Sequence, residues 1–230
     1  MFDDREDAGR QLAARLLPFR SDDPCVLALP RGGVPIGFEV AKALNAPLDL
    51  VLVRKIGAPF QPELAIGAIV DGENPELVLN DGFIESFDLK SYVAEESVRQ
   101  LEEIERRRRV YLGNRPRVNV SGRTALIVDD GIATGATIKA AIHATRRAHP
   151  KRLVLAVPVA PTDTLAMLRK EVDEVICLEE HEDFGSIGYY YLDFSQVSDD
   201  TVRDLIARSA PPPPSTPPSI DKRAVTGESR

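Results

Sequence analysis

Cysteine, long apolar runs and an excess of basic residues are all scarce or missing in this chain of 230 residues. Its two cysteines, Cys25 and Cys177, stand far apart in apolar runs and form neither a CxxC pair nor a zinc-like group with the three histidines. We therefore expect two reduced core thiols, as in a reducing cytoplasm. No apolar run approaches the roughly 18 residues of a membrane span, and residues 1–7 are acidic where a secretory signal is basic and then apolar. We expect a cytoplasmic protein that is neither exported nor inserted in a membrane.

A surplus of positive charge is absent as well, because the formal net charge is −7 at pH 7. Nonspecific nucleic-acid binders gain affinity when Lys and Arg displace the counterions of phosphates, so the composition argues against broad nucleic-acid binding and leaves only a local basic site open. The shares of charged (28%) and hydrophobic (43%) residues are typical of a globular protein with one core.

Proline gathers late in the sequence, where six of the 18 prolines fall within residues 211–218. No apolar periodicity follows, and such a segment cannot bury enough apolar surface to offset the entropy lost on ordering. We expect a flexible, extended tail over 209–230; a polyproline ligand for a partner is the alternative.

Before the tail, short apolar runs alternate with amphipathic stretches, which predicts an α/β fold with a mainly parallel sheet covered by helices on both faces. The expected strands are 25–29, 48–53, 65–70, 124–128, 153–160 and 174–178, and the expected helices are 7–17, 34–44, 91–111, 137–148, 163–170 and 199–208. In the longest helix, residues 102–109 place Glu before Arg at three i, i+4 spacings. This pattern favours a solvated helix face over a site for RNA or phosphate.

The most informative stretch is residues 125–137, in which an apolar strand leads to Asp129 and Asp130, a loop of small residues and a new helix. Open α/β sheets bind ligands at this end of their strands, and the N–H groups of a helix start bind phosphate. The two acids would repel a phosphate unless sugar hydroxyls lay between them, so the residues predict a ribose 5-phosphate site with the diol on the acids. The phosphate would bind to Gly131, Ala133, Thr134, Gly135, Ala136 and Thr137. A strand-to-helix turn in which one Asp caps the helix is the alternative.

Residues 128–135, Val-Asp-Asp-Gly-Ile-Ala-Thr-Gly, resemble the phosphoribosyl diphosphate (PRPP) signature of the type I phosphoribosyltransferases. In that family the two acids bind the ribose hydroxyls and the loop binds the 5-phosphate. Gly131 stands where the family usually has a branched apolar residue, and we expect it to loosen the loop. Ala133, where some purine-using relatives carry an acid, is similar to the adenine-using branch but does not assign an acceptor. The resemblance covers residues 5–208 and is strongest to a subgroup whose acceptor is not settled.

A second match follows the first expected strand, as Pro30-Arg31-Gly32-Gly33. In the resembling family this turn binds the diphosphate through backbone amides and a basic residue, and Arg suits bidentate phosphate binding. The resemblance implies that Arg31, Gly32 and Gly33 bind PRPP, with Lys55 as a second diphosphate ligand, and that Arg31 and Lys55 are the catalytic residues. A plain tight turn and an ordinary surface charge are the alternatives.

The resemblance also implies a Rossmann-like sheet of about five strands in a domain over 1–208, a mobile lid over about 57–88, folded in part as a hairpin over 65–79, and a hood over about 179–197. Within the hood, residues 179–184 and the aromatics soon after them suit an acceptor stack, a second metal site or a polar surface loop. These alternatives stay open.

The implied activity is transfer of ribose 5-phosphate from PRPP to a nucleobase-like nitrogen, with release of pyrophosphate and with Mg²⁺ held mainly by PRPP and only indirectly by Asp129 and Asp130. The implied partners are PRPP, a small-molecule acceptor and a second copy of the chain in a homodimer. A regulator that keeps this fold to sense PRPP or to bind RNA is the alternative.

Overall fold

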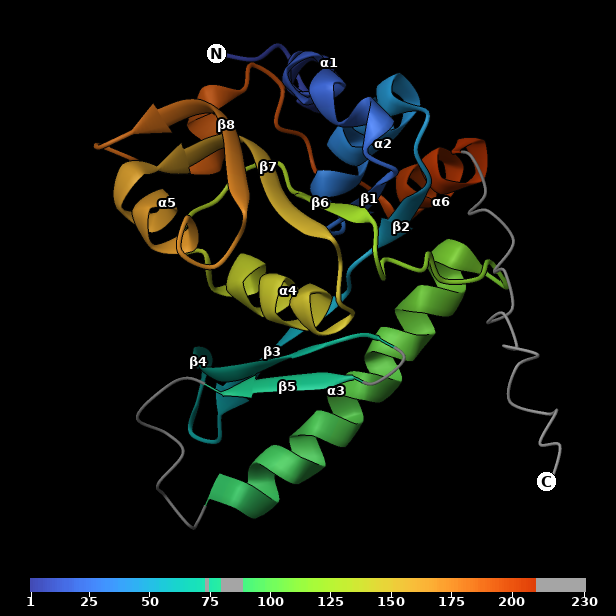
Figure 1. Cartoon of the computed structure of the whole chain (residues 1–230). Coiled ribbons are helices and arrows are strands. Elements are labelled where there is room, and N and C mark those ends of the chain that lie inside the picture. Colours follow the sequence, from blue (N-terminus) through green and yellow to red (C-terminus); the bar gives the residue numbers. More distant parts are fainter. Residues whose placement is uncertain (73–74, 80–88, 210–230) are drawn as a thin grey trace, which may run out of the picture.

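A five-stranded parallel sheet lies at the centre of the molecule (Figure 1). The structure is a computed structural model, and it describes residues 1–72, 75–79 and 89–209. The strand order is β2-β1-β6-β7-β8, with β1 Pro24–Ala28, β2 Leu48–Leu50, β6 Thr124–Val128, β7 Arg152–Pro161 and β8 Glu174–His181. The predicted α/β fold with about five parallel strands is confirmed.

Helices cover both faces of this sheet, because successive side chains of a strand point to opposite sides. Val26 and Ala28 of β1 belong to one half of the core, and Cys25 and Leu27 belong to the other. The first half is covered by α1 Arg5–Leu16, α2 Gly33–Leu44 and α6 Asp199–Arg208, and the second by α4 Ala136–Arg147 and α5 Thr162–Leu168. Two short 3₁₀ turns, Leu17–Ser21 and Ile187–Tyr190, complete this part of the chain.

A second sheet, antiparallel, lies between α4 and the long helix α3 Leu89–Leu112 (Figure 1). Its strands are β3 Val53–Ala58, β4 Gln61–Val70 and β5 Glu76–Leu79, in the order β3-β4-β5. The expected hairpin is therefore present as β4 and β5, inside the segment 57–88 expected to form a lid. Residues 73–74 and 80–88 of that segment and residues 210–230 of the expected tail lie outside the described residues.

Two strand predictions are corrected. The run 48–53 is not one strand, because β2 ends at Leu50 and β3 begins in the other sheet, and the run 65–70 belongs to the antiparallel sheet. The apolar pattern does not mark the break, since Val51 and Leu52 are as buried as the strand before them. The chain changes sheets where Leu52 meets Asp71: the Leu52 N–H donates to Asp71 Oδ1 at 2.9 Å, and the Asp71 N–H donates to the Leu52 carbonyl at 3.0 Å.

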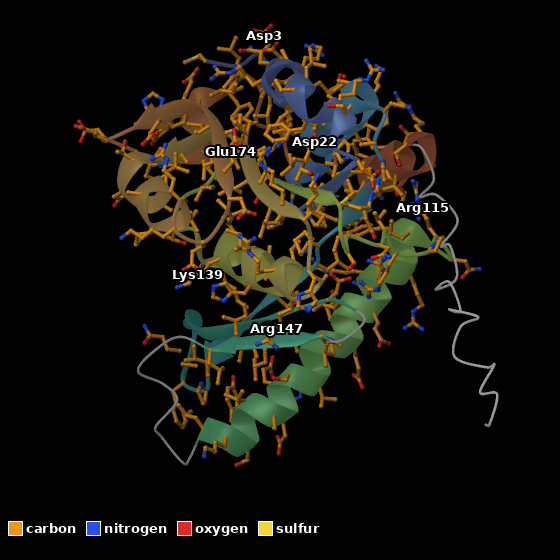
Figure 2. The ribbon with its side chains drawn as sticks, in the orientation of Figure 1. Asp3, Asp22, Arg115, Lys139, Arg147 and Glu174 are labelled. Atoms are coloured by element: carbon orange, nitrogen blue, oxygen red, sulfur yellow. The ribbon has the colours of Figure 1, made fainter. Side chains whose placement is uncertain are left out.

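A buried charge network holds α3 against this junction. Arg108, whose side chain is 13% exposed, donates to Asp71 Oδ2 at 3.0 Å and to Asp49 Oδ1 at 3.3 Å. Arg117 donates to the same Asp71 oxygen at 2.7 Å. Asp49 lies in β2, Asp71 follows β4, and Arg108 lies near the end of α3, so the network joins both sheets to the long helix. Arg115, labelled in Figure 2, adds a link from the segment after α3 to α6 by donating to the Ile206 carbonyl at 2.7 Å.

The prediction that the arginines of 102–109 line a solvated face is thus wrong for Arg108. It holds for Arg106 and Arg107, whose Nε atoms both donate to Glu103 at 2.7 Å near the helix surface. The i, i+4 spacing identifies side chains that share a face of a helix, but it does not identify which face meets the protein. Arg108 points inward because it pairs with the buried carboxylates of Asp49 and Asp71.

The burial of the two cysteine thiols determines their pKa values. Both cysteines are free; Cys25 is buried, and Cys177 is only partly buried. Burial raises the pKa of Cys25 to about 12 and that of Cys177 to about 11. In the described part of the chain, no helix combines the length and the apolar character that crossing a membrane requires.

Replacing Arg108 by Met is expected to lower the free energy of unfolding by about 3 kcal/mol, because it leaves the buried Asp49 without its ion-pair partner, while Asp71 keeps Arg117. Urea unfolding followed by circular dichroism measures this. Arg106→Met, an exposed arginine of the same helix, is the matched control and should cost less than about 1 kcal/mol. Equal losses in the two variants would contradict the role given to Arg108.

The folded protein is expected to resist alkylation by iodoacetamide at pH 8. With a pKa of about 12 only about one Cys25 side chain in 10,000 is a thiolate, and for Cys177 the fraction is about tenfold higher. Mass spectrometry should therefore detect slow labelling of Cys177, slower labelling of Cys25, and rapid labelling of both in urea. Rapid labelling of Cys25 in the folded state would contradict its burial.

Candidate active site

The two predicted motifs meet at one edge of the central sheet. β1 and β6 are neighbouring parallel strands with Ala28 opposite Val128, so the loops that follow them leave the sheet side by side. The Leu29 N–H extends this pairing by donating to the Val128 carbonyl at 3.0 Å. Parallel pairing therefore places residues 30–33 beside Asp129 and Asp130.

Glycine allows the two loops to touch. A Cβ atom on Gly32 would lie 2.0 Å from Asp130 Oδ2, and one on Gly33 would lie 2.7 Å from the Val128 carbonyl oxygen. No side chain fits at either position without moving the acids. The peptide bond between Pro30 and Arg31, just before these glycines, is cis.

The loop from Gly131 to Gly135 turns from β6 into α4. The Ile132 N–H donates to the Val159 carbonyl at 3.0 Å, and Thr164 Oγ1 donates to the Ala133 carbonyl at 3.2 Å, so the loop is fixed to the neighbouring strand and to α5. Gly135 has φ 74° and caps α4, and Ala133 and Thr134 are exposed. The start of α4 therefore faces outward with the unpaired N–H groups that a helix start presents.

Gly131 has a different role from the one expected. It is buried, and a Cβ atom there would lie 2.7 Å from Ile187 Cγ2 and 3.0 Å from Val159 Cγ1. The missing side chain makes room for Ile187 instead of leaving empty space around the loop. The expectation that this glycine loosens the loop overlooked this contact.

The carboxylates of Asp129 and Asp130 lie in a poorly solvated place. Asp130 is 9% exposed. Burial raises the pKa of Asp129 well above its ordinary value, and the neighbouring charge of Asp130 raises it further. Burial also raises the pKa of Asp130, but the guanidinium of Arg5 opposes that rise. Two adjacent acids with raised pKa values at a strand end are typical of a functional site.

Arg5 was not predicted from the sequence as part of this site. Its Nε donates to Asp130 Oδ2 at 2.8 Å, Nη1 donates to the Ser195 carbonyl at 2.7 Å, and its guanidinium carbon lies 3.9 Å from the centre of the Phe194 ring. In the sequence Arg5 is one basic residue in an acidic stretch, 125 residues from its partner. No local pattern pairs Arg5 with Asp130. The one hint in the sequence that Arg5 has a special role is that it is a lone basic residue among acids, just before a predicted helix.

Tyr191, in the segment 179–197 that was expected to form a hood, contacts the backbone of Asp130. Its hydroxyl donates to the Asp130 carbonyl at 2.6 Å, and burial raises its pKa. Phe2 forms a parallel bridge with Tyr191, and the ring centres lie 5.3 Å apart. The N-terminal segment, the hood and the signature loop are thus packed together.

Residues 179–184 are mostly engaged with their surroundings. Glu179 accepts from the N-terminal ammonium at 3.0 Å, and Glu180 pairs with Arg169. The rings of His181 and Phe184 lie 4.5 and 5.1 Å from that of Tyr190. Among the described residues no group of three or more His, Cys, Asp or Glu side chains could hold a metal ion, so the second metal site considered for this segment is not found there.

Arg31 points away from the acids toward α6. Its Nη1 lies 3.4 Å from Asp199 Oδ1, which also accepts from the Tyr111 hydroxyl at 2.7 Å. These contacts lower the pKa of Asp199, the Tyr111 bond most of all. A pocket of about 270 Å³ lies here, lined by Arg31 and residues 196–200.

Lys55 lies within β3 of the second sheet, whereas the expected strand 48–53 would have placed it just after a strand of the parallel sheet. It is exposed and lines another pocket of about 270 Å³ together with Ala136 and Thr137 at the start of α4. Lys139, labelled in Figure 2, and His143 line the same pocket from α4. The structure therefore brings Lys55 to the predicted phosphate loop, while Arg31 faces a different pocket.

The chain is similar in sequence to known proteins. The family model described as "Phosphoribosyl transferase domain" matches residues 4–195. Two curated proteins from two strains of Mycobacterium tuberculosis, provisionally named phosphoribosyl transferases, are each 49% identical over 210 residues, which is 91% of this chain and 47% of theirs. The chain spans about half the length of these curated relatives.

Solved structures are similar to this chain as well. The crystal structure of TT1426 from Thermus thermophilus is 42% identical, with a TM-score of 0.77 over 91% of this chain and 99% of that one. The structure of the AQ2163 protein from Aquifex aeolicus, 11% identical over 90% and 86% of the two chains, shares the fold with a TM-score of 0.50. The family match, the relatives and the strand-end acids beside a glycine turn agree, and the chain belongs to the type I phosphoribosyltransferase family.

Proposed function

We propose that this chain transfers the ribose 5-phosphate group of PRPP to a nucleobase-like nitrogen acceptor and releases pyrophosphate. The observation that carries the proposal is the direct contact between the two motifs, in which Gly32 and Gly33 lie against Asp130 and Asp129 at the ends of β1 and β6. A sugar that carries a phosphate at one end and a diphosphate at the other needs both loops within one molecule's reach.

Each part of PRPP has a partner in this arrangement. Asp129 and Asp130 accept hydrogen bonds from the ribose hydroxyls, and residues 131–137 bind the 5-phosphate through backbone N–H groups and the hydroxyls of Thr134 and Thr137. Backbone amides of Gly32 and Gly33, with Arg31 and Lys55, bind the diphosphate. Arg31 leaves Asp199 to do so, and Lys55 reaches from the second sheet.

The reaction breaks the bond between C1 of the ribose and the diphosphate oxygen, which keeps the electron pair, while the acceptor nitrogen forms the new bond to C1 and loses its proton to the released diphosphate or to solvent. The protein orients the two substrates, stabilises the charge on the leaving diphosphate with Arg31 and Lys55, and excludes water under the hood. No side chain forms a covalent bond to the sugar in this scheme.

The acids are suited to a divalent cation. Asp129, which is partly buried, and Asp130, which is buried, are adjacent carboxylates, and the guanidinium of Arg5 compensates the charge of Asp130. Oxygen ligands of this kind suit Mg²⁺, which keeps several waters and binds mainly to substrate phosphates. When bound with PRPP, Mg²⁺ would neutralise diphosphate charge, and these two residues would hold it indirectly, through water or the ribose oxygens.

The rest of the proposal concerns the chain around the site. It comprises a catalytic domain over 1–208, a lid over about 57–88 and a hood over about 179–197 that cover the bound substrates, and a tail over 209–230 outside the domain. It also includes a cytoplasmic location and a homodimer.

Pyrophosphate release from PRPP and Mg²⁺, measured across a panel of nucleobases, amines and aromatic acids, tests the function. Changing Asp129→Asn together with Asp130→Asn should lower the rate at least about 100-fold, because the diol loses both ionised acceptors. Asp22→Asn with Asp23→Asn, an adjacent acid pair before β1 at the opposite end of that strand, is the control and should stay within about 2-fold. An unmodified protein that binds PRPP tightly but uses no acceptor would be a sensor, and one that does not bind PRPP would contradict the proposal.

Gly32→Ala tests the contact between the loops. The added methyl group would lie 2.0 Å from Asp130 Oδ2, so it must displace the carboxylate, and PRPP affinity measured by calorimetry should fall by about 10-fold or more. Gly122→Ala is the control for a strained glycine substitution away from the site: a Cβ atom there meets nothing within 4 Å, but φ is 73°, so the variant should lose stability and keep its PRPP affinity. Unchanged PRPP affinity in Gly32→Ala would show that Asp130 does not contact the ribose.

A further inference from the structure

The N-terminal end of α1 reaches into the proposed ribose site through Arg5. Its Nε lies 2.8 Å from Asp130 Oδ2, and the two side chains are only 11% and 12% exposed. This is no loose surface pair, since an exposed arginine would stay solvated and mobile. A buried pair of this kind fixes the direction of both side chains.

The guanidinium of Arg5 is held on more than one side. Nη1 donates to the Ser195 carbonyl at 2.7 Å, and the ring of Phe194 packs against the guanidinium, with 3.9 Å from its carbon to the ring centre. The backbone around Arg5 is fixed as well, because Asp4 caps α1 by accepting from the Asp7 N–H at 2.7 Å. Arg5 is therefore a rigid donor and not one of several rotamers.

Asp130 also packs against the turn proposed to bind the diphosphate. The carboxylate lies where a side chain on Gly32 would be, and the Asp130 carbonyl accepts from the Tyr191 hydroxyl at 2.6 Å. Because Oδ2 is bonded to Arg5, Oδ1 is the Asp130 oxygen left to accept a hydrogen bond from a ligand. The orientation of this acid thus depends on residues from the first turn of the chain and from the hood.

We propose that Arg5 is a positioning residue for ribose recognition: it holds the Asp130 carboxylate in place so that Oδ1, together with Asp129, accepts from the vicinal hydroxyls of PRPP. This inference rests on the proposed function, because it takes PRPP as the ligand of the two acids. It makes the N-terminal segment part of the sugar site, and it predicts that Arg5 matters for ligands that carry the diol and not for the diphosphate alone.

Calorimetry with two probes, PRPP and inorganic pyrophosphate, each with Mg²⁺, tests this. Arg5→Gln should weaken PRPP binding by about 10-fold or more and leave pyrophosphate binding within about 2-fold, because pyrophosphate has no hydroxyl for Asp130. Arg5→Lys, which keeps a donor and the charge, should recover part of the loss. Arg10→Gln, an exposed arginine of the same helix whose Nη2 lies 3.6 Å from Asp7, is the matched control and should bind both probes like the unmodified protein.

A double-mutant cycle with Asp130→Asn separates positioning from direct contact. If Arg5 acts through Asp130, Arg5→Gln should weaken PRPP binding by no more than about 2-fold further in the Asp130→Asn background. An undiminished loss in that background, or an equal loss of pyrophosphate binding, would overturn the inference. So would an Arg5→Gln variant that binds PRPP as Arg10→Gln does.

Folding is checked by near-UV circular dichroism, and Phe194→Leu serves where Arg5→Gln does not fold. This variant removes the ring beside the guanidinium but keeps the ion pair, and it should weaken PRPP binding several-fold more than pyrophosphate binding; equal effects on the two probes would count against the inference. An unmodified protein that binds no PRPP would instead defeat the proposed function, and the inference with it. The two failures are thus distinguishable.

Discussion

The loops after β1 and β6 can share one ligand only because glycine stands where they touch. Parallel pairing of the two strands fixes their ends side by side, and the space between them is smaller than a methyl group at Gly32. Any side chain there would push Asp130 out of its place. The proposed function therefore depends first on packing: the acids and the neighbouring turn can lie close together only if residue 32 has no side chain.

The adjacent carboxylates of Asp129 and Asp130 repel each other, and residues from other parts of the chain compensate this repulsion. Two carboxylates sit next to each other with little water, so burial and mutual repulsion raise the pKa of Asp129. Arg5 supplies one positive charge from α1, and the Tyr191 hydroxyl donates to the backbone carbonyl of Asp130. Arg5 near the N-terminus and Tyr191 therefore both contact Asp130 just after β6. This explains why the N-terminal segment and residues 190–195 pack on each other.

A second buried charge network carries the antiparallel sheet. Arg108 pairs with Asp49 of the parallel sheet and with Asp71 at the end of β4, so the sheet that holds Lys55 is tied to the central sheet at its base. Its far side rests on α4, whose first residues line the pocket with Lys55. The proposed diphosphate ligand and the proposed phosphate loop are thus positioned by an anchor well away from either.

Much of the site could be predicted because its parts are local in the sequence. Residues 125–137 contain the strand, both acids, the small-residue loop and the helix start, and residues 30–33 contain the turn of the neighbouring strand. The break between β2 and β3, the inward turn of Arg108 and the contact of Gly131 with Ile187 could not be predicted. Each depends on a partner far along the chain, which neither periodicity nor spacing records.

The sequence by itself determined the fold class, most of the strands and helices of the parallel-sheet part and the kinds of side chain that follow β1 and β6, because hydrophobic periodicity and loop chemistry act over a few residues. Only the tertiary structure decided that Arg5 pairs with Asp130, that Arg31 faces α6 and that Lys55 comes from a separate sheet. The physical reason is that burial and charge act through space, so the partner of an ion is settled only when distant segments pack together.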